Sequence, residues 1–389
     1  MFKRLLPTRL YKPSLVNLHC RYFQEQKAPI PVPPTTEEKP SEPKPKKQQQ
    51  PKKQQQPKPQ QATVTAQTIE RDFSSLKLFD IAANLSDDRF KGVYYGTSLH
   101  DPDFDLVIKR ANKYGVRKFL FAAGYIEDAL DSYKLSLGSE DFYCTIGVHP
   151  CRAMEPFKDY EREHKGEEIP REEVVSRYIT KIDKLIEASE RRDKFVAIGE
   201  CGLDYDRLEY ADKETQLLAF PPHFDLAHKY QLPMYLHSRA TEGDFARLVR
   251  ENRHKFPTGV VHSFTGDIGE LRELLDMGLY IGVNGCSLKT EENLEMVKQI
   301  PLERIMLETD CPYCDIRNSH ASSKYVKTAI PKVAKEKYKC STEKLNKDRN
   351  EPCTMIQVLE VVSALKGVSE EEIAQKAWEN TLSMFNLKE

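Results

Sequence analysis

From about residue 76 onward, the chain alternates short apolar runs with longer amphipathic stretches. Short runs rich in β-branched and aromatic residues predict buried strands, whereas an apolar period of about 3.6 residues predicts helices. Strands and helices that alternate in this way are typical of βα units on a parallel sheet. Eight strands are predicted, at residues 78–82, 118–122, 143–148, 196–199, 233–236, 259–261, 279–283 and 304–308.

Amphipathic stretches fill the intervals between these strands. Eight βα units over roughly 235 residues predict a (β/α)8 TIM-type barrel, whose functional loops follow the carboxyl ends of the strands. A doubly wound open sheet is the main competitor, but no Gly-rich phosphate loop follows the first strand. A helical pair near 354–365 and 369–385 is expected to close over the barrel. The main internal helices are predicted at 103–114, 171–191, 213–230, 244–252, 268–277 and 291–299.

Four of the predicted strands lead into side chains that can bind a metal, namely Glu200, His237, His262 and Asp310, spaced 37, 25 and 48 residues apart. A single histidine in an apolar strand is usually a core residue, and a buried carboxylate is rare without a partner. Their recurrence at the same end of four parallel strands favours a shared divalent cation. Histidine and carboxylate ligands suit zinc, manganese or magnesium, and such an ion activates water for hydrolysis.

The sequence around these residues resembles the TatD family of metal-dependent deoxyribonucleases. Residues 199–205 (GECGLDY) match the G-E-x-G-L-D motif of that family. The resemblance covers about residues 76–389 and is strongest to the eukaryotic branch, through segments 284–290 and 320–322. Further family motifs follow in the expected order at 236–239, 261–266 and 308–312, with 147–150 and 349–352 completing the set.

The resemblance implies a metallo-hydrolase barrel that cleaves DNA phosphodiester bonds, as a 3′-5′ exonuclease, with DNA as its partner. It implies that Glu200, His237, His262 and Asp310 are metal ligands. Two of these residues are also expected to be catalytic. Glu200 would bridge two ions, and Asp310 would orient or deprotonate the attacking water.

The resemblance also implies a substrate-binding group. His149 and Arg239 are expected to hold phosphate oxygens, Arg239 as a planar fork. Asp204 is expected to belong to the same group. Two structural alternatives stay open: His149 as a capping residue at a strand end, and Asp204 as a turn carboxylate beside Arg207.

One segment departs from the family pattern. Many members end their first strand with H-x-H, which supplies two further ligands, whereas this chain has Ala82 and Asn84 at those positions. Alanine cannot coordinate an ion, and Asn84 offers only a neutral oxygen, which suits magnesium better than zinc. Asp80 remains as an anchor for the strand. We therefore expect one tightly held divalent ion, with a second bound weakly or recruited with substrate.

The first 75 residues differ in composition from the rest. Residues 1–27 are basic, amphipathic and almost free of acids, which predicts a mitochondrial targeting segment, with a cytoplasmic or nuclear location as the alternative. Residues 28–75 begin with Pro, Gln and Lys blocks and predict a disordered linker. Residues 1–61 carry 13 Lys/Arg against 4 Asp/Glu, so 46 basic and 56 acidic residues remain in 62–389. A basic arm thus precedes an acidic body.

Two other functions fit a metal site of this kind. The same chemistry would hydrolyse an ester or amide, such as an aminoacyl-tRNA ester, and the incomplete first-strand motif is compatible with a weakly active scaffold protein. Nine cysteines in 389 residues do not indicate a disulfide scaffold, and Cys311 and Cys314 match the C-x-x-C spacing only in isolation. No apolar run approaches the roughly 18 residues that a membrane span requires, so we expect no membrane insertion.

Overall fold

The computed structural model describes residues 71–340 and 343–389. The targeting segment at 1–27 and most of the linker at 28–75 lie outside the described residues and stay predictions. Residues 71–75, which the sequence assigned to the linker, belong to the folded domain. Phe73 is buried in the main core, and the Arg71 guanidinium forms ion pairs with Glu360 and Glu370.

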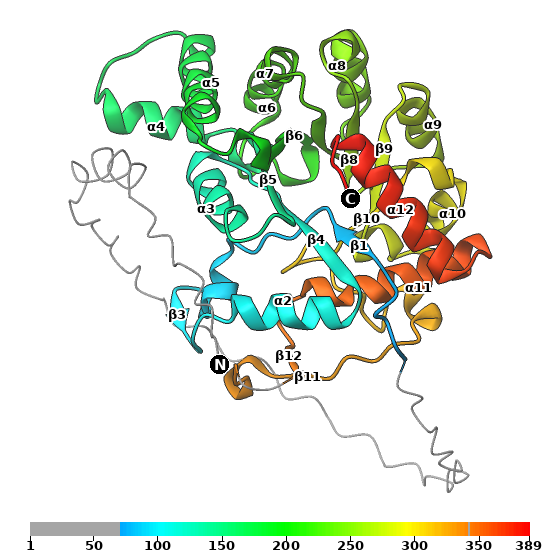
Figure 1. Cartoon of the computed structure of the whole chain (residues 1–389). Helices are drawn as coiled ribbons and strands as arrows, with labels where there is room; N and C mark the ends of the chain where they lie inside the picture. Colours follow the sequence, from blue (N-terminus) through cyan, green and yellow to red (C-terminus); the bar gives the residue numbers. More distant parts are fainter. Residues whose placement is uncertain (1–70, 341–342) are drawn as a thin grey trace, which may run out of the picture. The chain divides into compact units, whose positions relative to one another are not determined.

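A single eight-stranded parallel sheet forms the centre of this domain (Figure 1). Its first and last strands meet through a parallel bridge between Ala83 and Cys311, where Asn84 N donates to Cys311 O at 3.0 Å. The (β/α)8 prediction is confirmed, and each predicted strand overlaps an observed one. The strands, in their order around the sheet, are β1 (Leu78–Asp80), β4 (Val116–Phe121), β5 (Phe142–Ile146), β6 (Phe195–Asp204), β7 (Met234–Arg239), β8 (Gly259–His262), β9 (Tyr280–Val283) and β10 (Ile305–Leu307).

Helices surround the sheet (Figure 1). The prediction of one helix over 213–230 is wrong, because α6 ends at Ala219 and α7 starts at Pro222, whose ring removes a backbone donor and clashes with the preceding turn. Helices α3 and α4 were not predicted from the sequence. The helices are α2 (Phe104–Lys113), α3 (Ile126–Ser136), α4 (Glu155–Glu163), α5 (Arg171–Ala188), α6 (Lys213–Ala219), α7 (Pro222–Tyr230), α8 (Asp244–Asn252), α9 (Ile268–Asp276), α10 (Glu291–Gln299), α11 (Met355–Lys366) and α12 (Glu370–Met384).

The C-terminal helix α12 closes the amino-terminal end of the barrel. The rings of Trp378 and Phe385 lie 6.2 and 6.3 Å from the ring of Phe79, which stands in β1 inside the barrel. Tyr143 and Val196, at the starts of β5 and β6, belong to the same apolar cluster. The expected closure is therefore seen for the second helix of the predicted pair, α12, whereas α11 packs in the main core, and the opposite, carboxyl-terminal end is left for a site.

A long loop between β10 and α11 covers part of that carboxyl-terminal end. It contains two short strands, β11 (Lys332–Val333) and β12 (Leu345–Asn346), and it lies near the hairpin of β2 (Val93–Tyr94) and β3 (Thr97–Ser98). The fully buried Arg349, near the end of the loop, forms an ion pair of 2.6 Å with Asp103 at the start of α2, and Glu351 of the same loop forms one of 2.7 Å with Arg110 of α2. Such pairing compensates for the desolvation of the guanidinium. No helix of the described residues is long and apolar enough to cross a membrane.

Candidate metal centre

Glu200 is placed by an unusual segment of β6. Gly199 adopts φ of +143°, and a Cβ atom at this position would stand 2.1 Å from the carbonyl oxygen of Tyr235 in β7. Only glycine tolerates both this conformation and this close approach. Glu200 N then donates to Ala123 O at 2.9 Å, which fixes the residue at the carboxyl end of the barrel.

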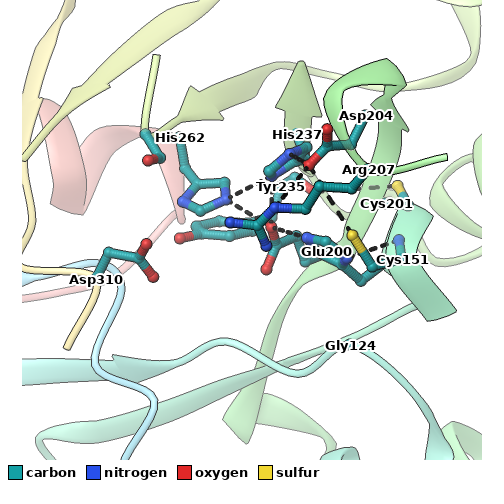
Figure 2. A network of polar contacts seen from close by, with 12 residues as sticks. Gly124, Cys151, Glu200, Cys201, Asp204, Arg207, Tyr235, His237, His262 and Asp310 are labelled. Carbon is teal, nitrogen blue, oxygen red and sulfur yellow. Dashed lines mark hydrogen bonds and ion pairs between the residues drawn. The ribbon is translucent and has the colours of Figure 1, made fainter. Parts of the chain in front are cut away.

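Three imidazole rings converge on one oxygen of Glu200. Its Oε1 lies 2.6 Å from His262 Nε2 and 2.9 Å from His237 Nδ1 (Figure 2). His149 Nε2 lies 3.2 Å from the same oxygen. Burial raises the pKa of Glu200, but the interactions with His262 and His149 outweigh it, so this pKa lies well below the usual range. The carboxylate is therefore ionised and central to the cluster.

This donor set fits a divalent cation. The candidate ligand atoms Glu200 Oε1, His237 Nδ1 and His262 Nε2 lie within 3.4 Å of one another, and His149 adjoins them as a fourth side chain. Burial lowers the pKa of His262, but Glu200 and Glu308 raise it well above its ordinary value. The cluster thus favours a positive charge among its nitrogens, and a cation held by imidazole and carboxylate ligands supplies such a charge.

Carboxylates stand behind two of the rings. His237 Nε2 lies 3.3 Å from Asp204 Oδ2, and His262 Nδ1 faces Glu308 Oε2 at 3.6 Å. His262 Nδ1 and Glu308 Oε2 are both buried, and neither has a hydrogen-bond partner in the described part of the chain. A carboxylate on the second nitrogen is the usual support of a metal-binding histidine, because it fixes the ring and the tautomer.

His149 is supported differently. The backbone N–H of Cys151 donates to His149 Nδ1 at 3.0 Å, so His149 also caps the short helix that follows it. Because a backbone amide always donates, Nδ1 must accept, and the ring proton of the neutral imidazole sits on Nε2. The Nε2–H group then faces Glu200 as a donor. This tautomer suits a hydrogen bond to an oxygen better than coordination of a metal.

Asp204 is buried behind the site, whereas Arg239 lies at its more exposed edge. Asp204 is fully buried, accepts from Asp206 N at 3.1 Å and stands behind His237, with Arg207 Nε 3.8 Å away. Asp204 thus contacts His237, and its contact with substrate stays a prediction. Arg239 is more open, with 38% of its side chain exposed, and its Nε donates to Asp206 at 2.9 Å.

Asp310 lies on the other side of the site, across from His237 (Figure 2). Its Oδ1 accepts from Asn84 Nδ2 at 2.9 Å and its Oδ2 from the Cys314 thiol at 3.1 Å. Burial raises the pKa of Asp310 to about 6. Asn84 thus presents its amide nitrogen to Asp310, and the carbonyl oxygen that the sequence offered as a weak ligand points elsewhere. Ala82 is fully buried and brings no ligand.

Asp80 anchors the first strand, as expected. Its carboxylate accepts from Thr309 N at 2.9 Å and from the Thr309 hydroxyl at 2.5 Å, which ties β1 to the segment that carries Asp310. The thiol of Cys314 lies 2.7 Å from that of Cys286, whereas Cys311 is buried in the core. The C-x-x-C spacing therefore does not describe the closest thiol pair.

Two residues that contact the candidate ligands were not predicted from the sequence. Glu308 supports His262, and Cys314 supports Asp310. Glu308 lies two residues before the predicted ligand Asp310, at the end of an apolar strand. A charged residue at such a position already indicates a buried partner or a role in the site. The contact of Cys314 depends on the path of a loop, which no local pattern indicates.

Comparison with known proteins identifies the family. The model of the family described as TatD related DNase matches residues 79–386. Deoxyribonuclease Tat-D of Schizosaccharomyces pombe is 41% identical over 313 residues, which cover 80% of this chain and 96% of that protein. A protein of Pantoea ananatis named 3′-5′ ssDNA/RNA exonuclease TatD is 30% identical over 314 residues, 80% of this chain and 100% of its own length.

A solved structure agrees with these sequence matches. The crystal structure of a TatD family hydrolase from Entamoeba histolytica superposes with a TM-score of 0.70 at 36% identity, and the match covers 79% of this chain and 98% of that one. The likeness therefore spans the whole barrel, including every strand that leads into the candidate centre. The chain is a hydrolase and belongs to the TatD related DNase family.

Proposed function

We propose that this protein is a metal-dependent deoxyribonuclease that removes nucleotides from DNA in the 3′-5′ direction. The observation that carries the proposal is the convergence of His149, His237 and His262 on Glu200 at the carboxyl end of the barrel. A site at this end is typical of enzymes with this fold. Relatives named as deoxyribonucleases and as a 3′-5′ exonuclease support the substrate and the direction.

The side chains divide the work by position. Glu200, His237 and His262 would hold a divalent ion, which supplies Lewis-acid charge beside the scissile phosphate. Asp204 and Glu308 keep the two rings oriented. Asp310 faces this cluster from the opposite side, where its carboxylate orients the attacking water and accepts its proton.

Two residues would contact the substrate. His149 presents an Nε2–H donor beside Glu200, a position from which it reaches a phosphate oxygen next to the ion. Arg239 lies at the open rim and adds a planar, permanently charged donor. We expect magnesium or manganese to support cleavage, with one ion held tightly. The second ion, on the side of Asp310, is expected to bind weakly because Ala82 and Asn84 stand where the family has histidines.

A cleavage assay tests the proposal. A 5′-labelled single-stranded DNA of about 20 nucleotides is incubated with the purified protein and magnesium, manganese or zinc, and its products are resolved on a sequencing gel. A ladder that shortens from the 3′ end, lost with a chelator and with Asp310→Ala, is the expected result. Intact DNA under every metal condition would refute the nuclease function. Release of the labelled 5′-terminal nucleotide without a ladder would refute the direction.

A further inference from the structure

A large groove adjoins the candidate metal centre and has no assigned role. It has a volume of about 1530 Å³ and lies between residues 87–95 and the long loop after β10. Cys314 lines it, and the same thiol donates to Asp310 at 3.1 Å, so the groove begins beside the proposed catalytic carboxylate. Typical small-molecule pockets measure roughly 300–1,000 Å³, so this groove suits an extended ligand.

The groove is basic on an acidic domain. Residues 62–389 contain 46 Lys/Arg and 56 Asp/Glu, whereas the lining of the groove contains more bases than acids. A local excess of positive charge beside a nuclease centre indicates an anionic polymer as ligand. Its bases, apart from the buried Arg349, are Arg89, Arg317, Lys327, Lys332, Lys335 and Lys347, and its acids are Asp87, Asp88, Asp315 and Asp348.

Two of these cations are available to a ligand. Lys332 pairs with Asp315, and Lys335 lies 3.6 Å from an oxygen of Asp348. Arg317 and Lys347 are exposed, and among the described residues neither side chain has a carboxylate within ion-pair distance. Their charges are therefore free to meet phosphates without first breaking an internal pair.

Aromatic rings accompany the charges. Tyr313, directly before Cys314, is 52% exposed, and the Arg89 guanidinium lies over its ring at 4.2 Å from the ring centre. Tyr95 is 99% exposed, with Lys335 Nζ 5.5 Å from its ring centre. Exposed rings beside cations are the usual platform on which the bases of a single strand stack, since duplex bases have no free face inside the helix.

We infer that this groove binds single-stranded DNA beyond the nucleotide at the metal centre, with phosphates on Arg317 and Lys347 and a base on Tyr313. The inference rests on the proposed nuclease function and extends it. Because Arg349 and Glu351 hold the loop against α2 through Asp103 and Arg110, the groove is held in place before substrate arrives. Affinity should therefore increase with strand length until the groove is filled.

Binding of labelled oligodeoxythymidylates tests the inference. Fluorescence anisotropy is measured with a chelator present, so that no cleavage occurs, on strands of three and ten nucleotides. We expect the ten-nucleotide strand to bind the wild type at least about tenfold more tightly. In the double variant Arg317→Ala/Lys347→Ala this advantage should shrink, and the slope of log Kd against log salt should fall by about 1.4, close to 0.7 for each lost phosphate contact.

Tyr313 provides a matched pair of variants. Tyr313→Ala should weaken the ten-nucleotide strand on the order of tenfold and leave the salt slope unchanged, because stacking carries no charge. Tyr313→Phe keeps the ring, loses only the hydroxyl bond of 3.2 Å to Asp87, and should bind like the wild type. Lys184→Ala, an exposed lysine on α5, controls for loss of charge elsewhere. Melting temperatures show that each variant folds.

The outcomes separate this inference from the nuclease proposal. Unchanged affinity and salt slope in the double variant, or a blunt ten-base-pair duplex that binds as tightly as the single strand, would overturn the groove assignment. The same proteins are then assayed for cleavage with magnesium or manganese. A wild type that binds the longer strand through Arg317 and Lys347 but never cleaves it would refute the nuclease function and leave the groove as a binding site.

Discussion

The two sides of the candidate centre are built differently. On one side, three imidazoles lie within 3.2 Å of Glu200 Oε1, and Asp204 and Glu308 support two of them from behind. On the other side, Asp310 has one amide and one thiol as its donors. The first side concentrates ligands for a cation, whereas the second presents a single carboxylate held by neutral groups.

This difference gives the two sides separate roles in the proposed reaction. A cation needs several imidazole and carboxylate donors at short range, and the side of Glu200 provides them. A proton acceptor needs a carboxylate held at a fixed position near neutral pKa, and burial raises the pKa of Asp310 to about 6. We therefore expect the absence of the first-strand histidines to weaken the binding of a second ion more than it weakens the acceptor.

The largest loss of DNA cleavage is expected from a change at Glu200, the carboxylate at the centre of the three imidazoles. Glu200→Gln keeps the shape of the side chain but removes the charge on which the three rings converge. DNA cleavage should fall by at least about a thousandfold, the upper range for loss of one charge-stabilising group in an active site. The measurement is the cleavage rate of labelled single-stranded DNA at saturating magnesium. Glu172→Gln, on the exposed face of α5, is the control and should cleave at the wild-type rate.

The number of tightly bound metal ions tests the difference between the two sides directly. We expect titration calorimetry of the wild type to show one tight equivalent of manganese. His237→Ala should abolish it. Asp310→Asn should still bind one equivalent of manganese, with an affinity reduced by about tenfold or less. Its rate of cleavage should fall by about a hundredfold or more, because the proton acceptor is lost. Two tight equivalents in the wild type would show that the two sides hold ions equally well.

The sequence predicted the side of Glu200 better than the side of Asp310, for a physical reason. Glu200, His237 and His262 follow apolar strands, and the register of parallel strands brings such residues together without knowledge of the loops. The pairing of His237 with His262 in the β7–β8 register is an example. The carboxylates behind the rings, such as Asp204, depend on side-chain direction, which strand periodicity alone does not give.

The surroundings of Asp310 depend on loops. Its donors Asn84 and Cys314 follow β1 and β10, and their contacts arise only when the bridge between Ala83 and Cys311 closes the barrel. Hydrophobic periodicity predicted the eight strands, yet it carries no information about the path of the segment after β10. The groove that begins at Cys314 could not be predicted for the same reason.

Acid should lower the free energy of unfolding through His223, which is buried close to the Glu200 side of the centre. His223 contacts the segment that leads into His149, where its Nε2 accepts from Val148 N at 3.0 Å, and burial lowers its pKa to about 4. Because the folded pKa lies below the ordinary value of about 6.5, the unfolded chain binds the proton first, and stability falls as pH decreases from 6.5 to 4. Between pH 7 and pH 5 the loss should be about 2 kcal/mol.

Urea unfolding of the metal-free protein at pH 7 and pH 5 measures this loss. His223→Gln can still accept from Val148 but does not titrate, so the difference in unfolding free energy between pH 7 and pH 5 should be about 2 kcal/mol smaller in this variant. Equal differences in both proteins would show that His223 is not the group responsible. The centre itself would then be the source of any acid sensitivity.

The smallest effect is expected on the side of Asp310. Asn84→Ala removes the 2.9 Å hydrogen bond to Asp310 Oδ1, and a bond to a charged group contributes about 1.5 kcal/mol, or roughly tenfold. If Asn84 only positions the acceptor, kcat should fall by about this factor with KM and manganese affinity unchanged. A variant that loses its tight ion instead would make Asn84 a ligand. The two sides of the centre would then share one ion, and the division between ligand side and acceptor side would fail.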